Sequence, residues 1–256
     1  ELLFQRRYRK GFFTALCGAT LLLLAGHPVT AFTMLLGLSV YFMVRLAFQK
    51  RQGLPLGAPV ALWASAWVLA ILVCAAQLAP FFEYLGNQYQ GQDLAAFGAE
   101  RGLPFSAAAV FWIPRFFGTA ADGNYWGDLD SNRYSMIYPG IAVWLCVAVA
   151  LFARGSTRQK RAAVIALALA AGFGLALTFE LYPFNYVHSL PFFSAIKRSY
   201  HICFAVFALP LLGAIGLDTW IGGTRPWRAL VPPIGVVVLA SLVVAGVWRF
   251  DSAIIR

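Results

Sequence analysis

The sequence predicts an all-α polytopic membrane protein with about seven transmembrane helices. Hydrophobic residues make up 61% of the 256 residues and charged residues only 12%, whereas a typical soluble domain is about half apolar and about a quarter charged. Long apolar runs are separated by short polar connections, and the basic residues concentrate in every second connection. Helices are expected because backbone groups in lipid must be hydrogen-bonded within the protein.

Seven apolar runs are the predicted spans of a single transmembrane domain, residues 1–256. The first is short: as a helix it covers about 22 Å, against a hydrocarbon core of about 30 Å. Since the chain opens with Glu1, we expect it to be part of a longer protein. The runs are Gly11–Ala25, Thr30–Phe48, Pro59–Leu85, Met136–Ala153, Ala162–Tyr182, Tyr200–Ile221 and Leu230–Trp248.

The distribution of basic residues predicts the orientation of the spans. Twelve of the 20 Lys and Arg residues lie before the first run or after the second, fourth and sixth runs, and Arg45 lies near the end of the second run. The positive-inside bias makes these connections cytoplasmic. Because the basic residues lie between spans, the net charge of +10 does not indicate nucleic-acid binding. The outer side receives the turn at His27, residues 86–135 as an extracytoplasmic loop, and residues 183–199.

The turn Gly26-His27-Pro28 interrupts two apolar runs. Gly26 can adopt a positive φ, and Pro28 can begin the next helix, where its missing N–H has no partner to lose. A turn at membrane depth requires burial in protein or a wet cavity. His27 therefore either faces an outward-facing cavity or lies in a plain hairpin at the surface.

The outer loop is longer than a simple connector requires. Its middle, Phe105–Phe117, predicts a short interfacial or re-entrant helix rich in aromatic residues. The following segment carries Asn124, Tyr125, Trp126 and Asp128. Aromatic rings beside polar side chains suit a sugar, which stacks on a ring and hydrogen-bonds through its hydroxyls.

Two other interpretations of this loop remain open. Carboxylates at Asp122, Asp128 and Asp130 could bind a divalent cation through oxygen ligands, although their spacing lacks the EF-hand pattern. Alternatively, the segment is a solvated loop with interfacial aromatic residues. A divalent cation is thus a possible cofactor, no other cofactor is predicted, and no residue is assigned as a metal ligand.

Lys197 and Arg198 lie at the outer end of the sixth run, against the positive-inside bias. They could extend to lipid headgroups. Alternatively, they could hold an anionic substrate such as a lipid-linked phosphate through a guanidinium fork. His201 lies one turn further into the helix than Lys197, on about the same face.

Several short motifs together resemble the YfhO family of bacterial membrane proteins. The first is GHPVT at Gly26–Thr30, with Tyr41 and Arg45 in the following run. AAQLAPFFEYL at Ala75–Leu85 resembles the family's Gln-Leu-x-Pro-x-x-Glu pattern at the end of a span. YPG at Tyr138–Gly140 and the stretch Leu190–Asp218 resemble its later spans. The resemblance covers about Phe12 to Trp220.

The resemblance implies a GT-C-like glycosyltransferase fold. Such enzymes transfer a sugar from a polyprenyl-phosphate carrier on the outer face of the bacterial cytoplasmic membrane, often onto a cell-envelope acceptor. The family's catalytic aspartate would lie upstream of Glu1, so no catalytic base is carried over. At Lys197-Arg198-Ser199 the chain departs from the Arg-x-Pro-x-Arg-like run of the family.

We therefore expect the membrane region of a glycosyltransferase that uses a polyprenyl-phosphate sugar and contacts membrane lipids. Arg198 and Lys197 would bind the carrier phosphate. Asp128 and Glu83 are the lesser candidates for a base within the chain. The residues expected to line the outer cavity and bind sugar are His27, Asn124, Tyr125, Trp126 and His201. The alternatives are a transporter or flippase of a lipid-linked or anionic solute, and a non-catalytic membrane subunit.

Overall fold

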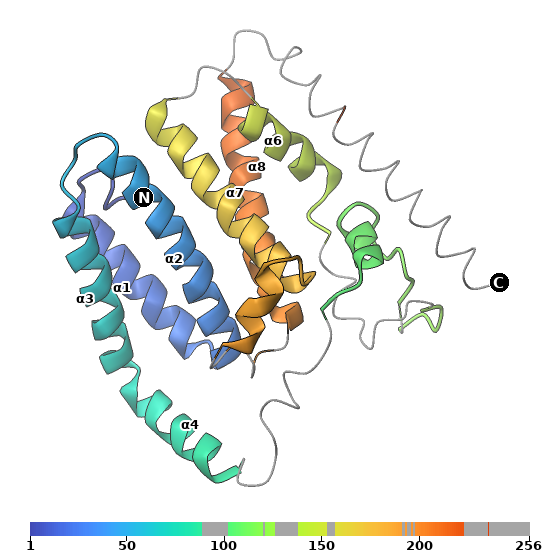
Figure 1. Ribbon diagram of the computed structural model, residues 1–256, viewed down its shortest axis with the longest axis horizontal. Helices are drawn as coiled ribbons and strands as arrows, with labels where there is room; N and C mark the ends of the chain where they lie inside the picture. The colour runs from blue at the N-terminus through green and yellow to red at the C-terminus, as the bar shows by residue number, and fades with distance from the viewer. Residues whose placement is uncertain are drawn as a thin grey trace.

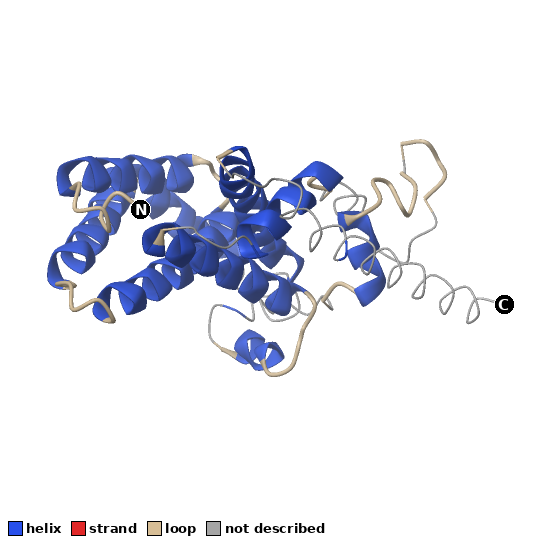
Figure 2. Cartoon of the chain, turned by 90° about the horizontal axis from the view of Figure 1, so that it is seen from above, coloured by secondary structure: helices blue, strands red, loops and turns tan. Residues whose placement is uncertain are grey.

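Every regular element in the described part of the chain is helical. The computed structural model describes residues 1–88, 102–119, 121–125, 138–152, 157–190, 193, 196, 198–222 and 235. Figure 1 and Figure 2 show the helices as a bundle with α4 extending from it. The α-helices are α1 (Tyr8–Leu24), α2 (Pro28–Lys50), α3 (Gly57–Val73), α4 (Ala75–Gln88), α6 (Ile141–Phe152), α7 (Arg158–Thr178) and α8 (Cys203–Ile221). The short 3₁₀ helices are η1 (Phe105–Phe111), η3 (Phe184–Ser189) and η5 (Arg198–Ile202).

The bundle consists of two packed groups of helices. In one group α1 packs against α3, and in the other α8 packs against both α6 and α7. The two groups meet where α2 packs along α7 (Figure 1). The larger core lies in the second group, where Leu103, Ala107 and Phe111 from the η1 segment join α6, α7 and α8. A smaller core around Ala19, Trp67 and Ala70 joins α1 to α3.

Three helices in the described part are long and apolar enough to cross a membrane. They are Val29–Lys50, Arg158–Thr178 and Arg198–Ile221. They correspond to the second, fifth and sixth predicted runs. The coarse prediction of an all-α protein with membrane-spanning helices is thus supported by the described residues. The finer prediction of seven spans in a GT-C-like fold stays a prediction.

The third predicted run, Pro59–Leu85, is helical but is not one continuous helix. It divides at Cys74 into α3 and α4, which are bent by 68°. Cys74 is buried, and its thiol donates to the carbonyl oxygen of Thr20 in α1 at 3.7 Å. Counted as one broken span, this pair raises the number of described candidate spans to four. The break thus lies at a residue that contacts α1, and the apolar run does not reveal its position.

The remaining predicted runs differ in what the structure describes. α1 has 17 residues and α6 has 12, so both fall short of a full span by length. The seventh run, Leu230–Trp248, lies outside the described residues apart from Gly235.

The short helix predicted within Phe105–Phe117 is present as η1, and it packs against the core of the bundle. η1 turns its Ala107, Val110 and Phe111 side chains into the protein, where all three are buried. Trp144 of α6 donates its indole N–H to the carbonyl oxygen of Phe111 at 2.8 Å, and its ring stacks on that of Trp112. Two tryptophan rings and a core contact therefore hold η1 against α6, and the interfacial or re-entrant position of this helix stays a prediction.

The two ends of the bundle differ in charge, as the positive-inside pattern predicts. The start of α7 and the end of α8 meet at one end, where the Lys160 ammonium lies 2.6 Å from Asp218. Three basic segments lie at the same end of the bundle: the start of α1, the start of α7 and the end of α2 (Figure 1). At the opposite end, the His27 ring lies 5.3 Å from the Tyr200 ring. The turn at His27 and the segment around Arg198 are thus brought together.

We expect Gly216→Ala to destabilise the protein. A Cβ at Gly216 would lie 1.7 Å from the carbonyl oxygen of Cys146, so α6 and α8 would have to separate. Overpacking typically costs about 1–3 kcal/mol, and a clash with backbone belongs at the upper end of that range. The free energy of unfolding in detergent measures the effect.

The matched control is Gly172→Ala, because a Cβ at Gly172 of α7 meets nothing within 4 Å. This variant should be neutral or should gain up to about 1 kcal/mol from the higher helix propensity of alanine. Equal stabilities of the two variants would contradict the α6–α8 packing.

Candidate functional site

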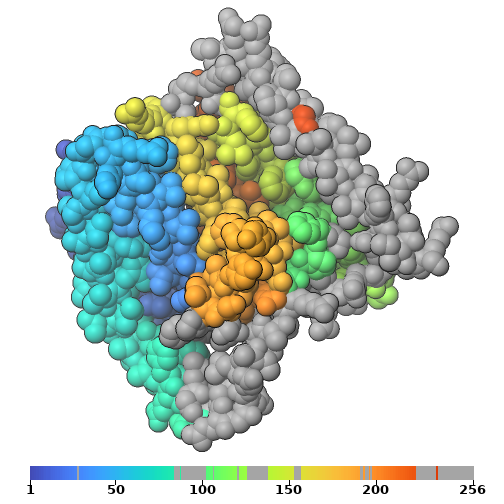
Figure 3. Space-filling model, in the orientation of Figure 1, coloured from blue at the N-terminus to red at the C-terminus, as the bar shows by residue number. Residues whose placement is uncertain are grey.

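The candidate site lies at the end of the bundle where α7 ends and α8 begins. The chain leaves α7 through Glu180, forms η3, and enters α8 through η5. Figure 3 shows this segment on the surface between α2 and the η1 region. Residues from four parts of the sequence therefore meet here: the turn at His27, the segment at Gly102, the end of α7 and the start of α8.

An ion pair between Arg198 and Glu180 forms the centre of the site. Nη1 of Arg198 donates to Oε1 of Glu180, and the backbone N–H of Gly102 donates to the same oxygen at 2.5 Å. The side chains are 26% and 31% exposed, so the pair lies at the boundary between protein and surroundings. Nε of Arg198 is buried and has no hydrogen-bond partner among the described residues. The guanidinium thus retains unused hydrogen-bonding capacity.

The backbone holds Glu180 in an unusual conformation. Its φ is +52°, in the left-handed region, which costs an ordinary residue about 1 kcal/mol. The Leu103 N–H donates to the carbonyl oxygen of Thr178 at 2.9 Å, which ties the η1 segment to the end of α7. A Cβ at Gly102 would lie 2.7 Å from that same carbonyl oxygen, so only glycine fits this approach. The carboxylate is therefore positioned by its own turn and by a second segment.

Two buried histidines lie beside the ion pair. The His188 and His201 rings are 5.4 Å apart, and Phe193 lies 6.2 Å from His201. His201 is fully buried, and neither of its ring nitrogens has a partner among the described residues. His188 uses Nε2 to contact the Leu177 carbonyl oxygen at 3.2 Å, while its Nδ1 is unpartnered. Burial is the main cause that lowers the pKa of His188, so the ring favours its neutral form.

These contacts change the expected role of His201. We expected it to line an outer cavity, but its side chain is enclosed between His188 and Phe193. A fully buried ring cannot touch a ligand without movement of its neighbours. His201 therefore lies behind the ion pair, next to the site but not on its surface.

His27 has a structural role that explains the turn in which it lies. It is the N-cap of α2: its Nδ1 accepts from the Thr30 N–H at 3.2 Å and lies 2.8 Å from the Thr30 hydroxyl. Gly26 has a φ of +76°, and Pro28 is the first residue of α2, as predicted. The side chain of His27 is exposed and contacts Tyr200, so the capped turn also borders the candidate site.

The described part of the outer loop is held by its own hydrogen bonds. Oδ1 of Asn124 accepts from the Thr119 N–H at 2.9 Å, and the Thr119 hydroxyl donates to Asp122 at 2.6 Å. Asn124 is exposed and Tyr125 is half-buried. Of the other predicted loop residues, Trp126, Asp128 and Asp130 lie outside the described residues.

Two predicted site residues remain, Glu83 and Lys197. Glu83 is exposed on α4, which extends away from the bundle (Figure 1). Lys197 lies outside the described residues. Within the described ranges, no group of three or more His, Cys, Asp or Glu residues is arranged to hold a metal ion.

Sequence reasoning missed Glu180, His188 and Gly102 as members of the site. The break in charge bias at Arg198 implied that something compensates the charge, but the partner is 18 positions away along the chain. A signal did exist, because Glu180 is an acidic residue at the outer end of the preceding span. The role of Gly102 had no sequence signal, since it depends on how the loop folds back onto α7.

No protein-family model, curated protein or solved structure matches this chain.

We expect His27→Ala to lower the free energy of unfolding by about 1 kcal/mol, because the first turn of α2 loses its side-chain acceptor. His27→Asn should retain most of the stability, since a short amide oxygen can accept from the same N–H. Denaturation in detergent, followed by circular dichroism, compares the three proteins. Equal losses of unfolding free energy in His27→Asn and His27→Ala would count against the capping role.

Proposed function

We propose that this chain is the membrane region of a GT-C-like glycosyltransferase in the bacterial cytoplasmic membrane. It would take sugar from a polyprenyl-phosphate carrier on the outer face and transfer it to a cell-envelope acceptor. Three things support the proposal: the predicted seven-span topology, the resemblance to the YfhO family and the site at Arg198. The end of the bundle that carries this site is the one opposite the basic connections, which supports an extracytoplasmic site.

The observation that carries the proposal is the Arg198 side chain, which is 26% exposed at the surface of the bundle and is held there by its ion pair with Glu180. An arginine guanidinium offers a planar fork that suits the oxygens of a phosphate. A boundary position lets the carrier phosphate approach from the headgroup region while the polyprenyl chain stays in lipid. Lys197, the neighbouring residue in sequence, would add a second positive charge.

We assign the role of base to Glu180, because its carboxylate lies beside Arg198; Asp128 and Glu83 stay the candidates predicted from the sequence. When the carrier phosphate takes over the contact with Arg198, the carboxylate of Glu180 is released from its ion pair. In the transfer, the acceptor hydroxyl oxygen bonds to the anomeric carbon and its proton passes to Glu180. The bond from that carbon to the carrier phosphate oxygen breaks, and the phosphate leaves with the electron pair beside Arg198.

The other predicted residues would contribute to binding rather than to bond-making. Tyr125 and Trp126 would stack on a sugar ring, and Asn124 would hydrogen-bond its hydroxyls. His27 borders the site through Tyr200 and would line the same outer cavity. The buried His201 would support Arg198 from behind. A divalent cation at Asp122, Asp128 and Asp130 stays an open alternative for the donor phosphate.

A transporter or flippase is the second candidate, and the break between α3 and α4 favours it. Discontinuous helices that meet near the bilayer midplane are typical of secondary transporters. α3, however, runs for 17 residues before the break, or about 25 Å of a hydrocarbon core of about 30 Å. Measured from the basic end, this length places the break near the outer boundary rather than at the midplane. The glycosyltransferase is therefore the preferred proposal.

We expect the complete protein in nanodiscs to transfer radiolabelled sugar from at least one polyprenyl-phosphate sugar in a panel. Arg198→Ala should reduce kcat/KM by about a hundredfold or more, because the departing phosphate loses its charge-assisted contact. Glu180→Gln should reduce kcat while donor binding persists. Arg51→Ala, at the basic end of the bundle, is the matched control and should leave transfer unchanged.

Binding of lipid-linked sugar without transfer or donor hydrolysis would exclude the enzyme and favour the flippase. Equal loss of transfer in Arg198→Ala and Arg51→Ala, with both proteins folded, would remove Arg198 from the donor site. Loss of donor binding in Glu180→Gln would show that the carboxylate organises the site and is not its base.

A further inference from the structure

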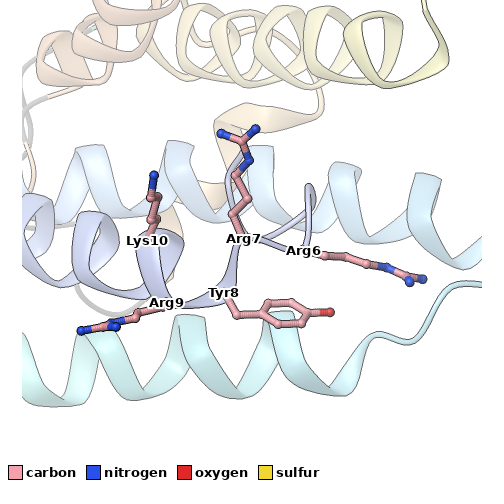
Figure 4. A pocket seen from close by; sticks show the side chains of 5 residues that line it. All are labelled: Arg6, Arg7, Tyr8, Arg9 and Lys10. Atoms are coloured by element: carbon pink, nitrogen blue, oxygen red, sulfur yellow. The ribbon is translucent and has the colours of Figure 1, made fainter.

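Four cationic residues close together in sequence line one pocket at the start of α1, at the end of the bundle opposite Arg198. The pocket has a volume of about 510 Å³ and is lined by Arg6, Arg7, Tyr8, Arg9 and Lys10. Figure 4 shows Arg7 and Lys10 pointing to the same side, whereas Arg6 and Arg9 point away from it. We call Arg6, Arg7, Arg9 and Lys10 the N-terminal basic patch.

No described acidic side chain neutralises the basic patch. All four cationic side chains are exposed, and none forms an ion pair with a described residue. The acidic residue next to them in sequence, Glu1, is already engaged: its carboxylate accepts from Arg45 at 2.7 Å and from Tyr41 at 2.6 Å. At the same end of the bundle, Lys160 has its own partner in Asp218. The patch is therefore a local excess of positive charge.

The patch is held by a folded anchor. Leu3 and Phe4, directly before it, are buried against Phe42, and Tyr8 packs on the same cluster. The turn between them is closed by backbone hydrogen bonds from Arg6 to Leu3 and from Arg7 to Leu2, at 3.2 and 3.0 Å. The cationic groups thus have a fixed position relative to α1 and need no ordering of a free tail on binding.

The neighbourhood of the patch indicates its ligand. It lies at the end of an apolar helix whose Phe13, Leu21 and Leu24 side chains are exposed, as suits a surface that faces acyl chains. The basic end of the bundle corresponds to the cytoplasmic boundary by the positive-inside rule. A lipid whose chains cover α1 could bring its headgroup phosphate to the patch there.

We propose that the N-terminal basic patch binds the headgroup phosphate of an anionic phospholipid of the cytoplasmic leaflet, with Arg7 and Lys10 as the principal contacts. Arginine supplies a two-pronged contact with phosphate oxygens and lysine a point charge. The paired orientation of Arg7 and Lys10 suits one phosphate between them. This site is separate from the proposed donor site at Arg198, so either can be wrong without the other.

Native mass spectrometry of the chain in neutral detergent, titrated with dioleoyl-phosphatidylglycerol or dioleoyl-phosphatidylcholine, tests the proposal. The anionic lipid should bind with higher affinity than the zwitterionic one. Arg7→Gln/Lys10→Gln should weaken phosphatidylglycerol binding on the order of thirtyfold, since each basic residue contributes about fivefold at an anionic surface. The control Lys50→Gln/Arg51→Gln removes the same charge elsewhere at this end and should change the affinity by less than about threefold.

Circular dichroism melting curves establish that both double variants are folded, which is expected because the replaced side chains are exposed. Equal affinities for the two lipids, or equal losses in the two double variants, would overturn the proposal of a defined headgroup site. Displacement of the lipid by an equal concentration of glycerol 3-phosphate would also overturn it, since the patch would then be a site for free phosphate compounds.

Discussion

The ion pair between Arg198 and Glu180 is the interaction on which the candidate site depends. It connects the start of α8 to the end of α7, and through the Gly102 N–H it also fixes the segment that leads into η1. Removing one partner would leave the other charge partly buried and uncompensated, which is strongly unfavourable. The position of Glu180 at a positive φ shows that the backbone accepts strain to keep this arrangement.

The helical bundle provides the rigid frame that places these two side chains. Association of helices in a membrane lacks the hydrophobic drive of water and depends on close packing, to which small residues contribute. The packing of α8 on α6 at Gly216, where a Cβ would overlap the Cys146 carbonyl group, fits that requirement. Since α8 packs on both α6 and α7, its start is fixed relative to the end of α7. The geometry of the ion pair follows from that packing.

Much of the helical framework could be predicted from the sequence. The runs Thr30–Phe48, Ala162–Tyr182 and Tyr200–Ile221 correspond to α2, α7 and η5 with α8, because sustained apolar length is a strong and local signal. The turn at Gly26-His27-Pro28 was also predictable, since each residue type there has a specific conformational use. The alternation of basic connections along the sequence also predicted that the basic segments lie at one end of the bundle and the Arg198 segment at the other.

Features that arise from tertiary contacts could not be predicted. The break at Cys74 coincides with a contact to α1, and the inward face of η1 coincides with a contact to Trp144. The members of the candidate site were harder to predict than the helices. Arg198 was predicted as its cation, but Glu180, His188 and Gly102 come together only when the chain after α7 folds back. His201 was predicted on the right helix but is enclosed by neighbours that no local pattern indicates.

A double-mutant cycle on the free energy of unfolding tests the ion pair most directly. Arg198→Gln, Glu180→Gln and the double variant would be compared in detergent, with Lys160→Gln and Asp218→Asn as the cycle for an exposed pair. We expect strong non-additivity for the first cycle, about 1 kcal/mol or more, and less than about 0.5 kcal/mol for the exposed pair. Additive effects of Arg198 and Glu180, within about 0.5 kcal/mol, would show that the two side chains are not coupled.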